Sequence, residues 1–136
     1  MTDYFVGTWI LDAELSDYQL GEPPKTGLYT ITADDAAYKV TMEWTTSGDE
    51  AMRADYVSIP DGKQYAYEDS DAVDFVCTTR VDDKTLDSES FKDGKRIAWA
   101  RRILSDDNNT MTITQSGSLP DGDEFNNVSV YRRKTD

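Results

Sequence analysis

The chain has 136 residues and a formal net charge of −13, and these two values bound its size and its partners. The length fits one domain, residues 1–136, with a single sizeable core. The negative charge would repel a phosphate backbone or an anionic leaflet, so we expect neither nucleic acid nor a membrane as a partner.

Missing residue types exclude several chemistries. The chain has no His, which removes Ser-His-Asp and Cys-His nucleophiles and imidazole ligation of zinc or haem. Its only cysteine, Cys77, follows Phe75-Val76 and is expected to be a small buried residue. The glycines lack the spacing of a phosphate-binding loop. We therefore expect no cofactor and no metal.

No segment of the sequence resembles a targeting or membrane-spanning element. A basic stretch followed by an apolar run is absent at the start, and no apolar run approaches the roughly 18 residues that span a bilayer. We expect a soluble, cytoplasmic protein that is a monomer or a weak homodimer.

The first predicted strand is Tyr4–Leu11. A period of two places Phe5, Gly7, Trp9 and Leu11 on one face. We expect Gly7 to allow another backbone to come close, and Trp9 to close the floor of a barrel as a core residue without a ligand role.

The following segment, Asp12–Leu20, precedes the pair Pro23-Pro24, which rules out a long helix. It is interpreted as a lid or a crossing loop. From Thr26 onward the sequence alternates between strand and turn patterns. The further predicted strands are Gly27–Thr32, Tyr38–Thr45, Met52–Ile59, Gln64–Tyr67, Phe75–Arg80, Thr85–Phe91, Arg96–Leu104, Thr110–Ser116 and Phe125–Arg133.

Two of the intervening turns carry further signals. The acidic run Glu68–Asp74 has carboxylates at short spacing, but it lacks the glycine and the terminal Glu of an EF-hand loop, so a solvated turn is favoured over a calcium site. The pair Asp93-Gly94 lies between two alternating runs and strongly predicts a hairpin.

Alternation also suggests which side chains face the interior. Tyr38, Val40, Met42 and Trp44 share one face of their strand and are expected to point inward. In Arg96–Leu104, one face carries Trp99 and Arg101 and the other carries Arg102, so either arginine could point inward.

About ten short antiparallel strands, joined by local hairpins, define the fold class. They predict an all-β protein, either a sandwich or an up-and-down barrel, and the local hairpins favour a barrel of about eight to ten strands. A barrel of that size removes exposed edges and has room for one small ligand.

The opening Phe5-Val6-Gly7-Thr8-Trp9 resembles the first strand of the calycin superfamily, which includes lipocalins and fatty-acid-binding proteins. Turn and strand motifs over nearly the whole chain are similar to a family of small bacterial lipocalin-like proteins. The resemblance implies a calycin barrel, in which a basic residue near the C-terminus lies across the Trp of the first strand. Arg132 or Arg133 could take that role by cation–π packing, or both could be exposed.

The sequence departs from fatty-acid-binding proteins at two places. Those proteins have a helix pair after the first strand, where this chain has the short Pro-rich segment. They also anchor a carboxylate with an Arg two residues before a Tyr of the last strand, and here Ser129 precedes Tyr131. The resemblance does not extend to that carboxylate site.

Three functions are compatible with these patterns. The first is binding of a small, largely apolar or aromatic molecule in the barrel interior, with Arg101 contacting an anionic group. The cavity would be lined by Tyr38, Met42, Trp44, Tyr56, Trp99 and Tyr131. The second is a His-free enzyme that uses an inward carboxylate, and the third is a packed barrel that acts as an interaction module. Candidates for that carboxylate are Glu43, Asp55, Asp87 and Glu89.

Overall fold

The computed structural model describes residues 4–19, 22–34, 37–67, 71, 73–118 and 122–134, and within these ranges it contains ten strands and no helix. No segment of these ranges is therefore a membrane-spanning helix. The strands are β1 (Gly7–Tyr18), β2 (Thr26–Asp34), β3 (Ala37–Thr45), β4 (Ala51–Ser58), β5 (Asp61–Ala66), β6 (Phe75–Asp82), β7 (Thr85–Lys92), β8 (Lys95–Leu104), β9 (Thr110–Ser118) and β10 (Glu124–Arg133).

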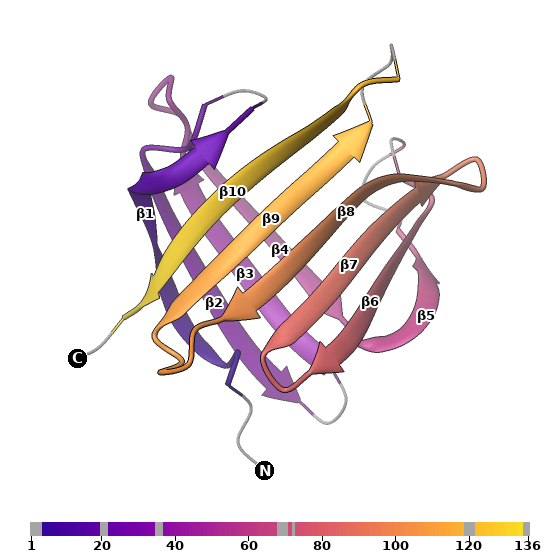
Figure 1. Ribbon diagram of the computed structural model, residues 1–136, viewed down its shortest axis with the longest axis horizontal. Coiled ribbons are helices and arrows are strands. Elements are labelled where there is room, and N and C mark those ends of the chain that lie inside the picture. The colour runs from indigo at the N-terminus through magenta and orange to yellow at the C-terminus, as the bar shows by residue number, and fades with distance from the viewer. Residues whose placement is uncertain are drawn as a thin grey trace.

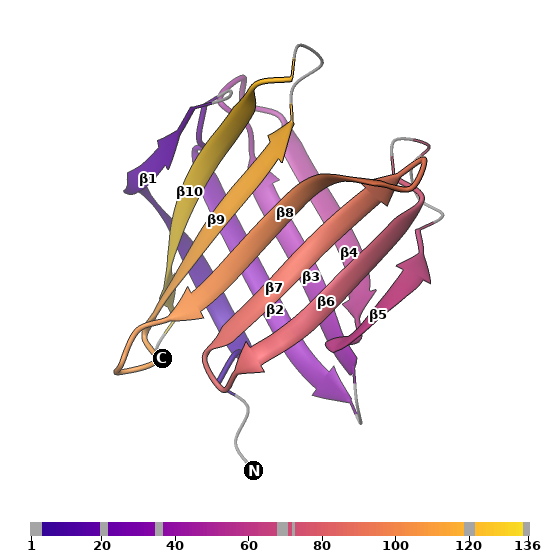
Figure 2. The ribbon, with the colours of Figure 1, turned by 45° about the vertical axis from the view of Figure 1, so that its right-hand side comes forward.

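All ten strands form one antiparallel sheet in the order β4-β3-β2-β1-β10-β9-β8-β7-β6-β5. Strands β1 and β10, the first and last in the sequence, pair with each other in the middle of this order. The sheet is strongly curled, so that β6–β10 lie in front of β2–β4 (Figure 1). This confirms the all-β, antiparallel, up-and-down arrangement expected from the sequence, whereas the expected removal of exposed edges is wrong, because β4 and β5 do not pair with each other. The edge strands are β4 and β5, and Figure 2 shows β5 at the margin of the sheet beside β6.

The expected lid or crossing loop at Asp12–Leu20 is wrong for its described part. Strand β1 continues to Tyr18, with a register shift against β10 between Asp12 and Asp17. Within this irregular stretch the Ser16 hydroxyl donates to the Asp12 carbonyl at 2.8 Å and accepts from the Val130 amide at 3.0 Å. The side chain thus replaces missing ladder hydrogen bonds, and the strand bends without ending.

Alternation decides which face of each strand is buried. In β3, Tyr38 and Val40 are buried while Lys39 is exposed. At the turn from β7 to β8, Asp93 and Gly94 have φ angles of 52° and 78°, the positive values of a tight hairpin turn. The acidic turn expected at Glu68–Asp74 includes residues 68–70 and 72, which lie outside the described ranges.

A hydrophobic floor closes the end of the barrel at which both termini lie (Figure 1). Phe5, Trp9 and Met111 are fully buried there, together with Leu86 and Leu104. This packed layer leaves the interior toward the opposite end of the strands for a cavity.

The floor is held by a C-terminal arginine. The guanidinium of Arg133 lies 4.2 Å from the Trp9 ring centroid and donates to the carbonyls of Tyr4, Val6 and Asn108 at 2.6, 2.8 and 2.9 Å. It thereby ties the N-terminal turn to the β8–β9 turn. Arg132, on the other face of β10, instead bonds Asp12 at 2.8 Å.

The expected role of Gly7 needs a correction. Its φ is +145°, and a β-carbon at Gly7 would lie 2.5 Å from Nη1 of Arg133. The close neighbour is therefore the arginine side chain over Trp9, and not another backbone.

Candidate functional site

A cavity of about 810 Å³ occupies the barrel interior next to the hydrophobic floor. The interior is therefore not completely filled by side chains, as a packed barrel would require. A space of this size lies within the range of pockets that hold a single small ligand.

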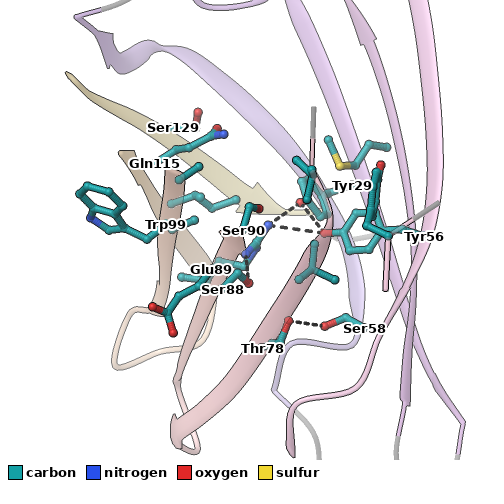
Figure 3. A pocket seen from close by; sticks show the side chains of 18 of the residues that line it. Tyr29, Tyr56, Ser58, Thr78, Ser88, Glu89, Ser90, Trp99, Gln115 and Ser129 are labelled. Atoms are coloured by element: carbon teal, nitrogen blue, oxygen red, sulfur yellow. Dashed lines mark hydrogen bonds between the residues drawn. The ribbon is translucent and has the colours of Figure 1, made fainter. Parts of the chain in front are cut away.

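Arg102 of β8 extends into this cavity. Its Nη2 donates to the hydroxyl of Tyr29 at 3.0 Å and approaches that of Tyr56 at 3.4 Å, while Nη1 donates to Ser88 at 3.2 Å (Figure 3). Tyr29 of β2 and Tyr56 of β4 lie across the barrel from β8, whereas Ser88 is on the neighbouring strand β7. The arginine cluster is defined as Arg102, Tyr29, Tyr56, Ser88 and Tyr131.

Further contacts in the arginine cluster join its tyrosines to one another. The hydroxyls of Tyr29 and Tyr56 are 3.0 Å apart, and the rings of Tyr29 and Tyr131 pack edge to face with centroids 5.3 Å apart. These two contacts fix Tyr29, Tyr56 and Tyr131 relative to one another around the guanidinium of Arg102.

Every hydrogen-bond partner of Arg102 in the described residues is a neutral hydroxyl, and no described carboxylate lies within ion-pair distance of it. Burial opposes the charge of Arg102, but the Tyr29 and Tyr56 oxygens hold its pKa above the ordinary value. Burial also raises the pKa of Tyr56 and of Tyr131 above the ordinary value near 10. The cluster is thus a cation among neutral phenols, and hydrogen bonds in the cavity can be offered to an anion.

The walls of the cavity differ in polarity. Met42 and Trp44 of β3 and Tyr56 of β4 form a largely apolar wall on one side. The opposite side, from β7, β9 and β10, carries the polar side chains Ser88, Ser90, Gln115 and Ser129 (Figure 3).

Five of the residues proposed from the sequence line the cavity, namely Met42, Trp44, Tyr56, Trp99 and Tyr131. Tyr38 does not, because it is buried in the hydrophobic floor, where its ring packs edge to face on Phe5 at 6.4 Å. It is therefore assigned to the core.

The expectation that Arg101 faces the cavity and contacts a ligand there is wrong. Arg101 is on the outer face of β8, where Nε and Nη2 bond both carboxylate oxygens of Asp87 at 2.7 and 2.8 Å. Trp99 borders the cavity, its ring is directed away from Tyr29 and Tyr56 (Figure 3), and the Arg96 guanidinium lies 4.3 Å from the ring centroid. The inward face of the strand is the other one, which carries Ala98, Ala100 and Arg102.

The carboxylates considered for an enzyme are each paired with an arginine, and two of them, Glu43 and Glu89, border the cavity. Glu43 and Asp55 flank Arg53, with oxygens 2.7 and 3.4 Å from its nitrogens. Asp87 pairs with Arg101 and Glu89 with Arg96. Hydrogen bonds from Thr41 and from Arg101 lower the pKa of Asp55 and of Asp87, respectively, which is the opposite of what an acid catalyst at neutral pH needs.

No group of three or more Cys, Asp or Glu side chains among the described residues is arranged to hold a metal ion. Of the polar atoms within the cavity, those of the arginine cluster form the most connected set. The site is therefore a cavity with one buried cation, Arg102, in its lining.

No protein-family model matches the sequence, and no curated protein matches it. The structure is nevertheless similar to solved structures over almost its whole length. One is a *Schistosoma mansoni* fatty acid binding protein in complex with arachidonic acid, with a TM-score of 0.62, 14% identity and coverage of 97% of both chains.

A second similar structure is the zebrafish ileal bile acid-binding protein complexed with cholic acid. Its TM-score is 0.58 at 11% identity, and the match covers 96% of this chain and 99% of that one. The fold of the chain is therefore similar to the folds of these two binding proteins.

Proposed function

We propose that the protein binds a small, largely apolar molecule with an anionic group inside the barrel, and that Arg102 holds the anion. The observation that carries this proposal is a guanidinium that faces a cavity of about 810 Å³ and has only hydroxyl partners among the described residues. Removing a charge from water costs several kcal/mol unless an opposite charge is supplied, so an entering anion would relieve that cost.

The apolar wall supplies the remaining affinity. Met42, Trp44 and the ring of Tyr56 offer hydrocarbon and aromatic surface, and burial of apolar surface contributes roughly 25 cal/mol per Å². The two similar structures contain arachidonic acid and cholic acid, both largely apolar molecules with a carboxylate, which supports a ligand of this kind.

A fluorescence titration with 1-anilinonaphthalene-8-sulfonate, an aromatic anion, tests the proposal. We expect saturable enhancement with one site per chain. Ala98→Phe, which adds a ring to the cavity wall, should weaken binding at least tenfold, whereas Thr114→Phe on the outer face of β9 should leave it within twofold.

Absence of saturable binding would contradict the proposal. Equal loss in both variants, or binding that Ala98→Phe leaves intact, would place the probe outside the barrel. Far-ultraviolet circular dichroism of each variant controls for its fold.

A further inference from the structure

The polar side of the cavity has hydrogen-bonding groups that the arginine cluster does not use. Ser88 is bonded to Arg102, and the Ser129 hydroxyl lies 2.6 Å from that of Tyr18. In contrast, the side chains of Ser90 and Gln115 make no hydrogen bond to any described residue, and both border the cavity. These two side chains are therefore available to hydrogen-bond a molecule in the cavity.

Strand register gives the position of these groups relative to Arg102. Arg102 is level with Ile113, Ala100 is level with Gln115, and Ala98 is level with Ser90. Gln115 is therefore two residues, and Ser90 four residues, from the level of Arg102 along the strands. At about 3.4 Å per residue, these groups lie roughly 7 and 14 Å along the sheet from the level of the cation.

A ligand segment without polar groups would bind less tightly against this polar side of the cavity. Covering the Gln115 amide with hydrocarbon removes its bound water without replacing the hydrogen bonds, which is unfavourable. A ligand oxygen at the same place would restore them. On the facing wall the Met42 side chain is apolar, and Trp44 offers only its indole N–H.

We infer that Gln115 and Ser90 form a second polar subsite, which recognises a hydroxyl or carbonyl oxygen near the middle of the ligand and selects oxygenated over plain hydrocarbon anions. This inference rests on the proposed function, because the anion at Arg102 sets the register of the ligand in the cavity.

The test is displacement of bound 1-anilinonaphthalene-8-sulfonate by three carboxylates of equal chain length. They are octadecanoate, its derivative with a hydroxyl at carbon ten, and its derivative with a hydroxyl at carbon two. We expect the mid-chain hydroxyl to tighten binding roughly threefold to tenfold, the value of one or two neutral hydrogen bonds, and the hydroxyl at carbon two to give no such gain.

Gln115→Leu replaces the amide with an apolar group of similar size. This variant should lose most of the preference for the mid-chain hydroxyl while it binds octadecanoate as well as, or better than, the unaltered protein. Ser90→Ala should lose a smaller part of this preference, and Thr114→Val, on the outer face, should keep all of it.

The outcomes separate this inference from the proposed function. Failure of the fluorescent anion to bind overturns both. If the anion and octadecanoate bind but the mid-chain hydroxyl brings no gain, or the gain survives Gln115→Leu and Ser90→Ala together, only the second subsite is refuted. Octadecanoates that leave the bound probe in place also count against the subsite.

Discussion

Arg101 and Arg102 are consecutive residues of β8, and their guanidinium groups lie on opposite faces of the sheet. Arg101 is neutralised on the outer face by two hydrogen bonds to Asp87, with its side chain 55% exposed. Arg102 faces the cavity and bonds only hydroxyl groups of the described residues. One arginine is therefore paired with a carboxylate and the other is not, so a substitution of Arg101 is a matched control for the same substitution of Arg102.

We expect Arg102→Met to weaken binding of 1-anilinonaphthalene-8-sulfonate roughly tenfold to a hundredfold, because charge-assisted hydrogen bonds to an anion contribute about 1.5–3 kcal/mol. Arg101→Met should change the affinity by less than twofold, because its guanidinium does not reach the cavity. Fluorescence titration of both variants gives the two dissociation constants. Similar losses in the two variants would refute the assignment of the anion to Arg102.

The pKa shifts in the arginine cluster predict a flat pH dependence. Arg102 stays charged and Tyr56 and Tyr131 stay neutral well above neutral pH, because their pKa values are all raised. The affinity for the sulfonate probe should be constant between about pH 6 and about pH 9.

A carboxylate ligand should behave differently at low pH. The cation beside it lowers the pKa of the bound carboxyl, so affinity is complete above the pKa of the free acid, about 4–5, and falls as the pH drops through that value. Titrations of the sulfonate and of octadecanoate over the same pH series measure both effects. A drop in sulfonate affinity centred near pH 8 would reveal another titrating group in the site.

The strands were predictable because burial on one face imposes a period of two on the sequence. The alternation in Tyr38–Thr45 and the Asp93-Gly94 hairpin each reflect local geometry that needs no knowledge of distant residues. The continuation of β1 to Tyr18 was not predictable in this way. It depends on the Ser16 hydroxyl bonding the Val130 amide, a contact between opposite ends of the chain.

The site was harder to predict because alternation separates two faces without saying which is inside. In β8 the outer face carries three large apolar residues, Ile97, Trp99 and Ile103, and the inner face carries two alanines, Arg102 and Leu104. Hydrophobicity therefore favours the wrong face. The signal that could have corrected it is the small size of Ala98 and Ala100, which leaves room for a cavity beside an arginine.

Gly7 and Arg133 form a coupled pair that a mutant cycle can measure. Gly7→Ala should destabilise the protein by roughly 1–3 kcal/mol, because φ is +145° and the new β-carbon would collide with the guanidinium held by three carbonyls. Gly48→Ala is the matched control, since its nearest neighbour would be 3.8 Å away. Urea unfolding gives both values.

Gly7→Ala should lower the free energy of unfolding by less in an Arg133→Met background. Part of the collision with the guanidinium is then gone, and mainly the backbone strain at position 7 remains. The difference between the two costs is the coupling energy, expected in the range of about 0.5–3 kcal/mol for residues in contact. Additive effects would mean that Arg133 moves aside freely and does not fix the floor.

Trp9 lies in the packed floor and Trp44 beside the cavity. Replacing each with Phe should therefore have different effects on stability and on ligand binding. Trp9 is fully buried, and its Nε1 donates to the Phe5 carbonyl at 3.1 Å. Trp9→Phe removes volume from a packed layer and leaves that carbonyl without its partner, so we expect a loss of roughly 2–4 kcal/mol in urea unfolding.

Trp44 borders the cavity, where the side chain is only partly buried. Trp44→Phe removes contacts with the cavity and with any ligand there, but it opens no sealed void and leaves no buried group unpaired. The free energy of unfolding should therefore change by less than about 1 kcal/mol, while the dissociation constant for the sulfonate probe rises several-fold. If both tryptophans affect unfolding equally and neither affects binding, the division of the interior into a packed floor and an open pocket is incorrect.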